Sequence, residues 1–365
     1  MKIGILGSRG IPNNYGGFEQ LAEYLSLGLV DLGADVWVYN SHTHPYKEKT
    51  WKSVNLIHCY DPEDKMGTAG QFVYDFNCIV DSRRRNFDLL LQLGYTSNSV
   101  WHWLLPSSPV TITNMDGLEW KRSKYNPKVQ KFLKYAENLA VKHSHYLVAD
   151  SEAIADYLKE QYARDSFFIP YGAEIFNKPD ESALRHFRLE KFGYYLLIAR
   201  MQPDNHIEDI IKGVLCSHSN KPLVVVGKTD NKFGSFLKKR YQGDRIKFQG
   251  AIYDLEILNH LRFFSEYYFH GHSAGGTNPS LLEAMAASSA ICADNNVFNK
   301  AVLGEDAFYF KNEKEISHLL DTCTGKPHHH EFIENNLQKI RTKYSWKSVI
   351  QGYYDLFQLA LKSSI

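Results

Sequence analysis

Residues 270–285 read HGHSAGGTNPSLLEAM. An apolar run at 266–269 precedes this stretch and a helical sequence from Ser280 to Ala287 follows it, so the pattern predicts a strand, a glycine-rich loop and a helix N-terminus. Asn278 suits the N-cap and Pro279 the first helical turn. Because glycines let a ligand approach the backbone and the helix dipole favours negative charge, the stretch is suited to an anion, and Glu283 is within reach of a ligand hydroxyl such as that of ribose. An ordinary connecting loop with a solvated Glu283 fits these residues equally well.

Short apolar runs alternate with helical patterns on both sides of this stretch, which predicts an α/β fold with parallel sheets. The first series of expected strands covers 2–7, 35–40, 54–60, 87–93, 110–114 and 146–150. The pattern then restarts with 194–199, 223–227, 246–250, 267–270, 290–293 and 307–310. Two Rossmann-like sheets in one chain predict a ligand site at the carboxyl ends of the strands, in a cleft between two domains.

The expected division follows this restart. Residues 170–191 are rich in Pro, Gly and charge, which favours a boundary there. We expect an N-terminal domain at 1–172, a second domain at 173–345, and a final helix at 346–365. The apolar positions of that last segment form one continuous stripe: Trp346, Val349, Ile350, Tyr353, Leu356, Phe357 and Leu361.

Bulk composition favours a globular protein: 44% of its 365 residues are hydrophobic and 23% are charged. The net charge of +1 gives no argument for nucleic acid. Its 14% aromatic content suits cores and also the stacking of sugars or bases. Five scattered cysteines without a CxxC pair indicate reduced thiols, so we expect a cytoplasmic protein. Because the sequence opens on a strand pattern and has no apolar run of about 18 residues, we expect neither a signal peptide nor a membrane helix.

Two loops of the first half are candidate sites. The loop after the first strand reads GSRGIPNNYGGFE at 7–19, which matches neither GxGxxG nor a phosphate-binding P-loop. Gly16 and Gly17 lie where a helix start meets a phosphate or an acceptor hydroxyl, although a structural turn is the alternative. The second loop, TNMDGLEWKR at 113–122, places Asp116 and Glu119 at a strand end, where catalytic or acceptor-binding groups lie; a cap or solvated acid is the simpler interpretation.

A basic, aromatic helix is expected directly after this loop. A solvated face and an anionic lipid contact are both compatible with its residues. Its cations are Lys121, Arg122, Lys124, Lys128, Lys131, Lys134 and Lys142, and aromatic residues such as Trp120 and Tyr135 lie between them.

Cations also end two strands of the second half. Arg200 and Lys228 each follow an apolar run, and together with the helix start at 278 they suit a diphosphate. No Asp-x-Asp pair occurs, so we expect no metal and no cofactor. His328–His330 is best interpreted as a surface loop that runs into a helix.

These pieces, in this order, resemble a GT-B glycosyltransferase of family 4 over nearly the whole chain. The resemblance rests on the N-terminal loop, AR…P at 199–203, GK at 227–228, FQG at 248–250, NPSLLEAM at 278–285 and YSWK at 344–347. Finer motifs, RGIP…YGGFE at 9–19, DGLEWKR at 116–122 and the opening stretch, are similar to a bacterial rhamnosyltransferase-like branch.

The resemblance implies a GT-B fold with an acceptor domain at 1–172, a nucleotide-sugar donor domain at 173–345, and a last helix that crosses back to the N-terminal domain. It also implies retaining, metal-independent hexosyl transfer in bacterial polysaccharide biosynthesis. The implied donor is dTDP-L-rhamnose. The acceptor is a saccharide or lipid-linked saccharide at the inner face of the cell membrane, with peripheral contact to anionic lipid. Asp116, Glu119 and Arg200 are the implied catalytic residues. The donor-binding residues are Gly16, Gly17, Lys228, Tyr253, His272, Gly275, Gly276, Thr277, Asn278, Pro279, Ser280, Leu281 and Glu283.

Three departures from the family pattern stand out. Of the usual glutamate pair, eight positions apart, only Glu283 is present, because residue 275 is glycine. The usual phosphate-binding lysine is replaced by Asn205, and the usual N-terminal histidine by Met115. Two alternatives therefore stay open: a sugar-nucleotide epimerase on the same fold, and a nucleotide-sugar-binding protein without transfer activity.

Overall fold

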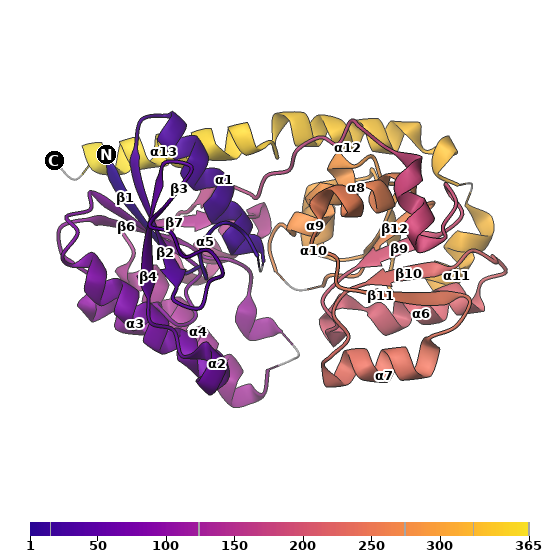
Figure 1. The fold of residues 1–365 in the computed structure, drawn as a ribbon, viewed down its shortest axis with the longest axis horizontal. Helices are drawn as coiled ribbons and strands as arrows, with labels where there is room; N and C mark the ends of the chain where they lie inside the picture. The colour runs from indigo at the N-terminus through magenta and orange to yellow at the C-terminus, as the bar shows by residue number, and fades with distance from the viewer. Residues whose placement is uncertain (15, 123–124, 274, 324, 364–365) are drawn as a thin grey trace. The chain divides into compact units, whose positions relative to one another are not determined.

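The computed structural model describes residues 1–14, 16–122, 125–273, 275–323 and 325–363 (Figure 1). Tyr15, Lys124 and Ala274 of the motifs above lie outside this range. The chain divides into two compact units, each with its own sheet. The first comprises 1–121, 125–172 and 346–365, and the second 122–124 and 173–345.

The first unit is an α/β sheet of strand order β3-β4-β2-β1-β5-β6-β7-β8. Its described strand pairs are parallel except β3–β4. The strands are β1 (Lys2–Leu6), β2 (Asp35–Ser41), β3 (Thr50–Trp51), β4 (Val54–Cys59), β5 (Leu89–Leu93), β6 (Val110–Asn114), β7 (Tyr146–Ala149) and β8 (Phe167–Phe168). The helices are α1 (Gly17–Asp31), α2 (Glu63–Met66), α3 (Gly70–Ser82), α4 (Pro127–His143) and α5 (Glu152–Tyr162), with 3₁₀ turns η1 (Gly67–Ala69), η2 (Ser99–Leu104) and η3 (Glu119–Lys121).

The second unit is a parallel sheet of order β11-β10-β9-β12-β13-β14. Its strands are β9 (Tyr195–Ile198), β10 (Leu223–Val226), β11 (Ile246–Gly250), β12 (Tyr267–His270), β13 (Ile291–Asp294) and β14 (Phe308–Phe310). Its helices are α6 (Ile207–Cys216), α7 (Lys232–Tyr241), α8 (Leu255–Phe264), α9 (Pro279–Ala286), α10 (Val297–Leu303), α11 (Glu313–Thr322) and α12 (His330–Thr342), with 3₁₀ turns η4 (Glu181–Phe187), η5 (Pro203–Asn205) and η6 (Lys326–His328).

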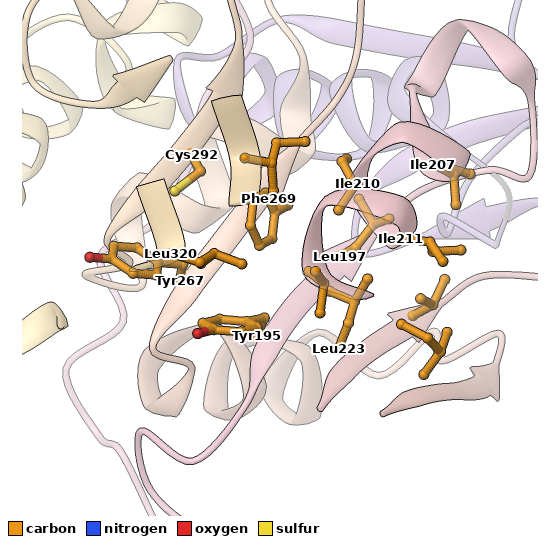
Figure 2. Close-up of a cluster of buried hydrophobic side chains, with 14 of the residues drawn as sticks. Tyr195, Leu197, Ile207, Ile210, Ile211, Leu223, Tyr267, Phe269, Cys292 and Leu320 are labelled. Atoms are coloured by element: carbon orange, nitrogen blue, oxygen red, sulfur yellow. The ribbon is translucent and has the colours of Figure 1, made fainter. Parts of the chain in front are cut away.

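Each sheet has a buried apolar core, as the alternating sequence pattern requires. In the second unit, side chains from the strands interleave with those of α6 and α11 (Figure 2). Tyr195, Leu197 and Phe269 are buried from the sheet side, and Ile210 and Ile211 from α6. The predicted fold class, α/β with two parallel sheets, is confirmed, and the ends of the expected strands differ by two residues at most.

The final helix, α13 (Trp346–Lys362), packs on α1 of the first unit. The rings of Tyr24 and Trp346 stack with centroids 4.3 Å apart. Gly28 makes room for the helix, because a Cβ at that position would lie 2.4 Å from Cδ1 of Ile350. The segment is therefore part of the first unit although it follows the second in sequence.

The expectation of one basic helix from Trp120 onward was wrong. Asn126 caps α4 by accepting from the N–H groups of Lys128 and Val129, and Pro127 is its first residue. Lys121 therefore ends the separate turn η3, and Arg122 lies before α4. A proline after a capping asparagine is the ordinary start of a helix, and this signal decides the boundary.

Candidate functional site

The switch point of the second sheet lies between β9 and β12, the neighbouring strands from which the order runs in opposite directions. In open α/β sheets, ligands bind outside the carboxyl ends of the strands at this point. Arg200 follows β9 and is exposed, and the opening stretch follows β12. The topology thus brings two candidate segments, predicted from separate parts of the sequence, to one edge.

Hydrogen bonds join these two segments. The Asn205 side chain donates to the Arg200 carbonyl at 2.8 Å, and its Oδ1 lies 3.0 Å from Nδ1 of His272. Ser273 donates to the Asp204 carbonyl through its backbone N–H and its hydroxyl, at 3.1 and 2.8 Å. Asn205 therefore fixes the site instead of supplying the cation that the family pattern has at its position.

Asn296 and Asn299 complete the support of His272. Their side-chain amides donate to its carbonyl oxygen at 3.0 and 3.1 Å. Neither residue was predicted from the sequence, because their position next to this loop depends on the β12–β13 pairing. An imidazole held in this way is suited to meeting a polar ligand atom at a fixed position.

The glycine at 275 has a conformational cause. Its φ is +127°, a region that L-residues rarely adopt, and a Cβ there would lie 3.1 Å from Nε2 of His272. A glutamate cannot take this backbone position without strain. The departure from the family's glutamate pair is thus built into the loop conformation.

The helix after the loop begins as predicted. Asn278 is the N-cap of α9, its Oδ1 accepts from the Ser280 N–H at 2.9 Å, and Pro279 is the first helical residue. The Leu281 N–H donates to the Asn278 carbonyl at 3.0 Å. The N–H groups of Ser280 and Leu281 therefore both have partners inside the protein. An anion at this end of α9 would be attracted by the helix dipole and by the preceding loop. Thr277 is buried, and Gly276 is partly exposed.

Glu283 lies on α9 in a setting that the sequence did not predict. Its Oε2 accepts from Nη2 of Arg262 at 2.5 Å. The Arg262 side chain is 1% exposed and that of Glu283 is 16% exposed, so the guanidinium lies deeper than the carboxylate. The sequence did contain a signal for this pair: Arg262 lies within the otherwise apolar end of α8, and a buried charge needs a partner of opposite charge.

The two remaining donor candidates, Lys228 and Tyr253, are both highly exposed. Lys228 follows β10 and is highly exposed, and its Nζ lies 2.8 Å from Oδ2 of Asp230. This hydrogen bond raises the pKa of Lys228, which stays a cation. Tyr253 is 75% exposed, one residue before Asp254, the N-cap of α8.

A buried histidine ends β12. His270 is 4% exposed, and burial, together with His272 and Arg262 nearby, lowers its pKa to about 3. It therefore stays neutral at physiological pH. Its ring lies 6.3 Å from that of Tyr268, which precedes it on the same face of the strand.

In the first unit, the corresponding switch point lies between β1 and β5. α1 begins at Gly17, with Gly16 as its N-cap, as expected. The loop before it is held by Glu19, which accepts from the Arg9 N–H at 2.8 Å. Arg9 itself forms an ion pair with Glu63 at 2.6 Å. Its cation is thus already neutralised within the first unit.

Asp116 follows β6, next to β5, and has a φ of +51°. Its N–H donates to Oδ1 of Asn114 at 3.0 Å, and the Asn114 amide donates to the Tyr353 hydroxyl of α13 at 2.9 Å. A non-glycine residue with positive φ costs about 1–2 kcal/mol, so this backbone is held in place by its surroundings. Glu119 is buried, whereas Asp116 is partly exposed, which favours Asp116 as the group that meets a substrate.

The turn that carries Glu119 is attached to α4 and α5. Nε1 of Trp120 donates to the buried Glu137 at 3.0 Å, and Lys134 lies 2.8 Å from the same carboxylate. The Lys134 ammonium also faces the rings of Trp120, Tyr157 and Tyr162 at 4.7–4.9 Å. Lys134 had been expected on the exposed basic face of the helix. It instead belongs to this partly buried cluster of one carboxylate and three rings.

In the part of the chain that the structure describes, no three His, Cys, Asp or Glu side chains gather as metal ligands. His329 packs on Phe308 and Phe332 instead, with ring centroids 4.8 and 6.0 Å away. No helix among the described residues is long and apolar enough to cross a membrane.

Comparison with known proteins identifies the architecture. Sucrose-phosphate synthase from Thermosynechococcus elongatus superposes with a TM-score of 0.81 at 14% identity, covering 99% of each chain. HepE from Anabaena, solved with UDP and glucose, gives a TM-score of 0.73 at 13% identity, covering 98% of this chain and 99% of its own. The chain has the GT-B fold.

Two further comparisons bear on the sequence. A glycosyltransferase from Rickettsia africae has a TM-score of 0.71 at 14% identity, covering 99% of this chain and 98% of its own. Residues 109–174 match a family described as a domain of unknown function, DUF1972. This segment includes Asp116 and Glu119. No curated protein matches the sequence.

Proposed function

We propose that the protein is a retaining, metal-independent glycosyltransferase that transfers a hexose from a nucleoside diphosphate sugar. The observation that carries this proposal is the edge of the second sheet at the switch point of a GT-B fold, where Asn205 links the Arg200 carbonyl to His272 on the loop that leads into α9. Structural neighbours bind UDP and UDP-glucose, which supports a donor of this class.

The chemistry requires stabilisation of the leaving diphosphate. Arg200 is exposed at the strand end, and its planar fork suits two phosphate oxygens. Lys228 supplies a second cation from the neighbouring strand, and the α9 dipole adds a third favourable interaction. Glu283 binds the ribose, and Tyr253 borders the base.

The donor sugar is L-rhamnose, delivered as dTDP-rhamnose. The loop conformation at Gly275 supports this choice, because a carboxylate at this position would require a strained backbone. A 6-deoxy sugar has one hydroxyl fewer and suits a site with fewer polar partners. Gly276, Thr277 and His272 border the sugar.

Asp116 positions or deprotonates the acceptor hydroxyl, with Glu119 as the reserve candidate, and Gly16 and Gly17 lie at the same edge of the first sheet. The acceptor is a saccharide or lipid-linked saccharide in bacterial polysaccharide biosynthesis. An exposed stripe on α4 supports a cytoplasmic enzyme at the inner membrane face: Lys128, Lys131, Tyr135 and Lys142 share one side of this helix.

The proposal is tested with a panel of nucleotide sugars, by thermal shift and by product analysis. The expected result is a stabilisation that is largest with dTDP-rhamnose, together with slow donor hydrolysis. Arg200→Ala should lower turnover about 100-fold, as expected for a charge that acts on the leaving group. Release of an epimerised sugar nucleotide without an acceptor would indicate an epimerase, and stabilisation without turnover a binding protein. No shift with any donor contradicts the transferase.

The membrane contact has its own test. Vesicles that contain anionic lipid should carry the protein upward in a flotation gradient, and neutral vesicles should not. Charge reversal of Lys128, Lys131 and Lys142 should abolish flotation while donor binding is kept. Flotation that is unaffected by the reversal argues against the α4 stripe.

A further inference from the structure

We propose that Arg262 is a positioning residue that sets the Glu283 carboxylate for the ribose of the donor. This inference rests on the proposed function, because it assigns a role within the same nucleotide site. Arg262 lies on α8 and does not belong to any of the loops at the strand ends. It acts through Glu283.

The Arg262 side chain donates hydrogen bonds to two residues of α9 and to one of its own helix. Nη2 donates to Oε2 of Glu283 at 2.5 Å and to Oγ of Ser280 at 3.1 Å, and Nη1 donates to Oδ1 of Asn259 at 3.0 Å. Ser280 and Glu283 are three residues apart on α9 and therefore share a face. One buried cation thus holds both Ser280 and Glu283, which lie on one face of α9 near its N-terminal end.

A second contact fixes the same point from the sheet. The Tyr268 hydroxyl of β12 lies 2.9 Å from Oγ of Ser280. Tyr268 is fully buried, and burial raises its pKa, so the hydroxyl keeps its proton. The start of α9 is therefore held by α8 on one side and by the strand that precedes the loop on the other.

The depth of the pair indicates a purpose beyond packing. Arg262 is covered and Glu283 is partly exposed, so the carboxylate lies between a permanent cation and the surface. A guanidinium cannot lose its proton in a protein, and its planar fork dictates where the acceptor oxygen lies. A lysine at this position would supply the charge without the planar fork, so the Glu283 carboxylate could rotate. Arg262 therefore selects one orientation of Glu283.

The test uses two nucleotides that differ only in the sugar hydroxyl. Thymidine diphosphate has the 3′-hydroxyl and 2′,3′-dideoxythymidine diphosphate does not, and a uridine pair is run alongside. Calorimetry on the full chain gives the ratio of the two Kd values. The wild type should bind the hydroxylated nucleotide at least about 10-fold more tightly, as expected for a hydrogen bond to a charged group.

Variants then separate positioning from stability. Glu283→Gln and Arg262→Met should each reduce the ratio to about threefold or less, and Arg262→Lys should reduce it although the charge is kept. Arg245→Met is the matched control, since Arg245 is a partly buried arginine of the same unit that donates to the carbonyls of Val214 and Leu215. It should lower the melting temperature and leave the ratio unchanged.

A ratio that stays at the wild-type value in Arg262→Met, with both nucleotides weakened equally, overturns the inference. If this variant does not melt cooperatively, Arg262→Lys decides: a reduced ratio supports positioning and an unchanged ratio contradicts it. Failure of the wild type to bind either nucleotide pair is a different result, because it overturns the proposed function itself.

Discussion

Single residues explain why the loop after β12 departs from the glycosyltransferase pattern that the sequence resembles. Asn205 connects the β9 and β12 loops, and Gly275 has a backbone conformation that needs glycine. The helix cap at Asn278 was predictable, because all its partners are neighbours in sequence. Arg262 was not predictable as a site residue, because its partner lies on another helix that only the fold brings close.

Gly275→Ala should weaken binding of the proposed donor, dTDP-rhamnose, about tenfold without unfolding the protein. A positive φ costs an L-residue about 1–2 kcal/mol, and the added Cβ lies 3.1 Å from Nε2 of His272. Calorimetric titration with the donor measures the loss. Gly33→Ala is the matched control, since φ is +83° there and a Cβ would meet no atom within 4 Å. It should share the backbone cost and keep wild-type affinity; equal affinity of the two variants would refute the argument.

The buried Lys326 should make stability depend on pH. Burial is the main cause that lowers its pKa from 10.5 to about 7 in the folded state. Below pH 7 the lysine is charged in both states. Between pH 7 and 10 the unfolded state binds more protons, so the wild type gains stability as the pH rises, by at most about 1.4 kcal/mol per pH unit.

Lys326→Met should lose this gain. The measurement is the free energy of unfolding from denaturant titrations between pH 6 and 9.5, compared with Lys128→Met, in which an exposed lysine is replaced. The free energy of unfolding of Lys326→Met should exceed that of the wild type by most at low pH, and this difference should shrink as the pH rises. Parallel curves for the two variants would show that Lys326 does not titrate in this range.

At the scale of elements, the apolar stripe of α13 was predicted from its spacing, and its packing on the N-terminal domain came from the resemblance alone. The particular helix that it covers, α1, was not predicted. The stripe faces α1, where Tyr24 stacks on Trp346 and Gly28 lies against Ile350. Periodicity shows which face of a helix is buried, but it does not predict which element covers that face. Periodicity also failed to predict the strands β3 and β8, because two residues are too few to show a period.

The close approach of α1 and α13 gives a test by double substitution. Gly28→Ala should destabilise the protein by about 1–3 kcal/mol, because the new methyl group overlaps Ile350. Ile350→Ala opens the space, so the double variant should be more stable than the sum of the single effects by about 0.5–3 kcal/mol. Denaturant unfolding measures all four proteins. Additive effects would show that the helices are further apart than described.

At the scale of the whole molecule, two repeated series of strands were sufficient to predict two parallel sheets, but not the order of strands within them. The order depends on pairings between segments that are distant in sequence, such as β9 with β12. It is this order that puts Arg200 beside the loop after β12. The fold class was therefore predictable, whereas the composition of the site depended on topology.

Removal of residues 346–365 should unfold the first unit and spare the second. The described part of this segment buries Trp346, Val349, Tyr353, Leu356 and Phe357. At about 1.5–3 kcal/mol for each large apolar side chain, their loss is comparable to the total stability of a domain. Hydrogen exchange should show lost protection in β1–β8 and retained protection in β9–β14. Equal loss in both units would contradict the division.

The position of α13 also separates the order of synthesis from the order of folding. The N-terminal half leaves the ribosome first, yet the helix that covers α1 is encoded after the whole second unit. At roughly 5–20 residues per second, the intervening 173–345 segment takes about 9–35 s to translate. During that interval the α1 surface has no covering helix. The nascent chain therefore exposes the apolar surface of α1 until residues 346–362 have been made.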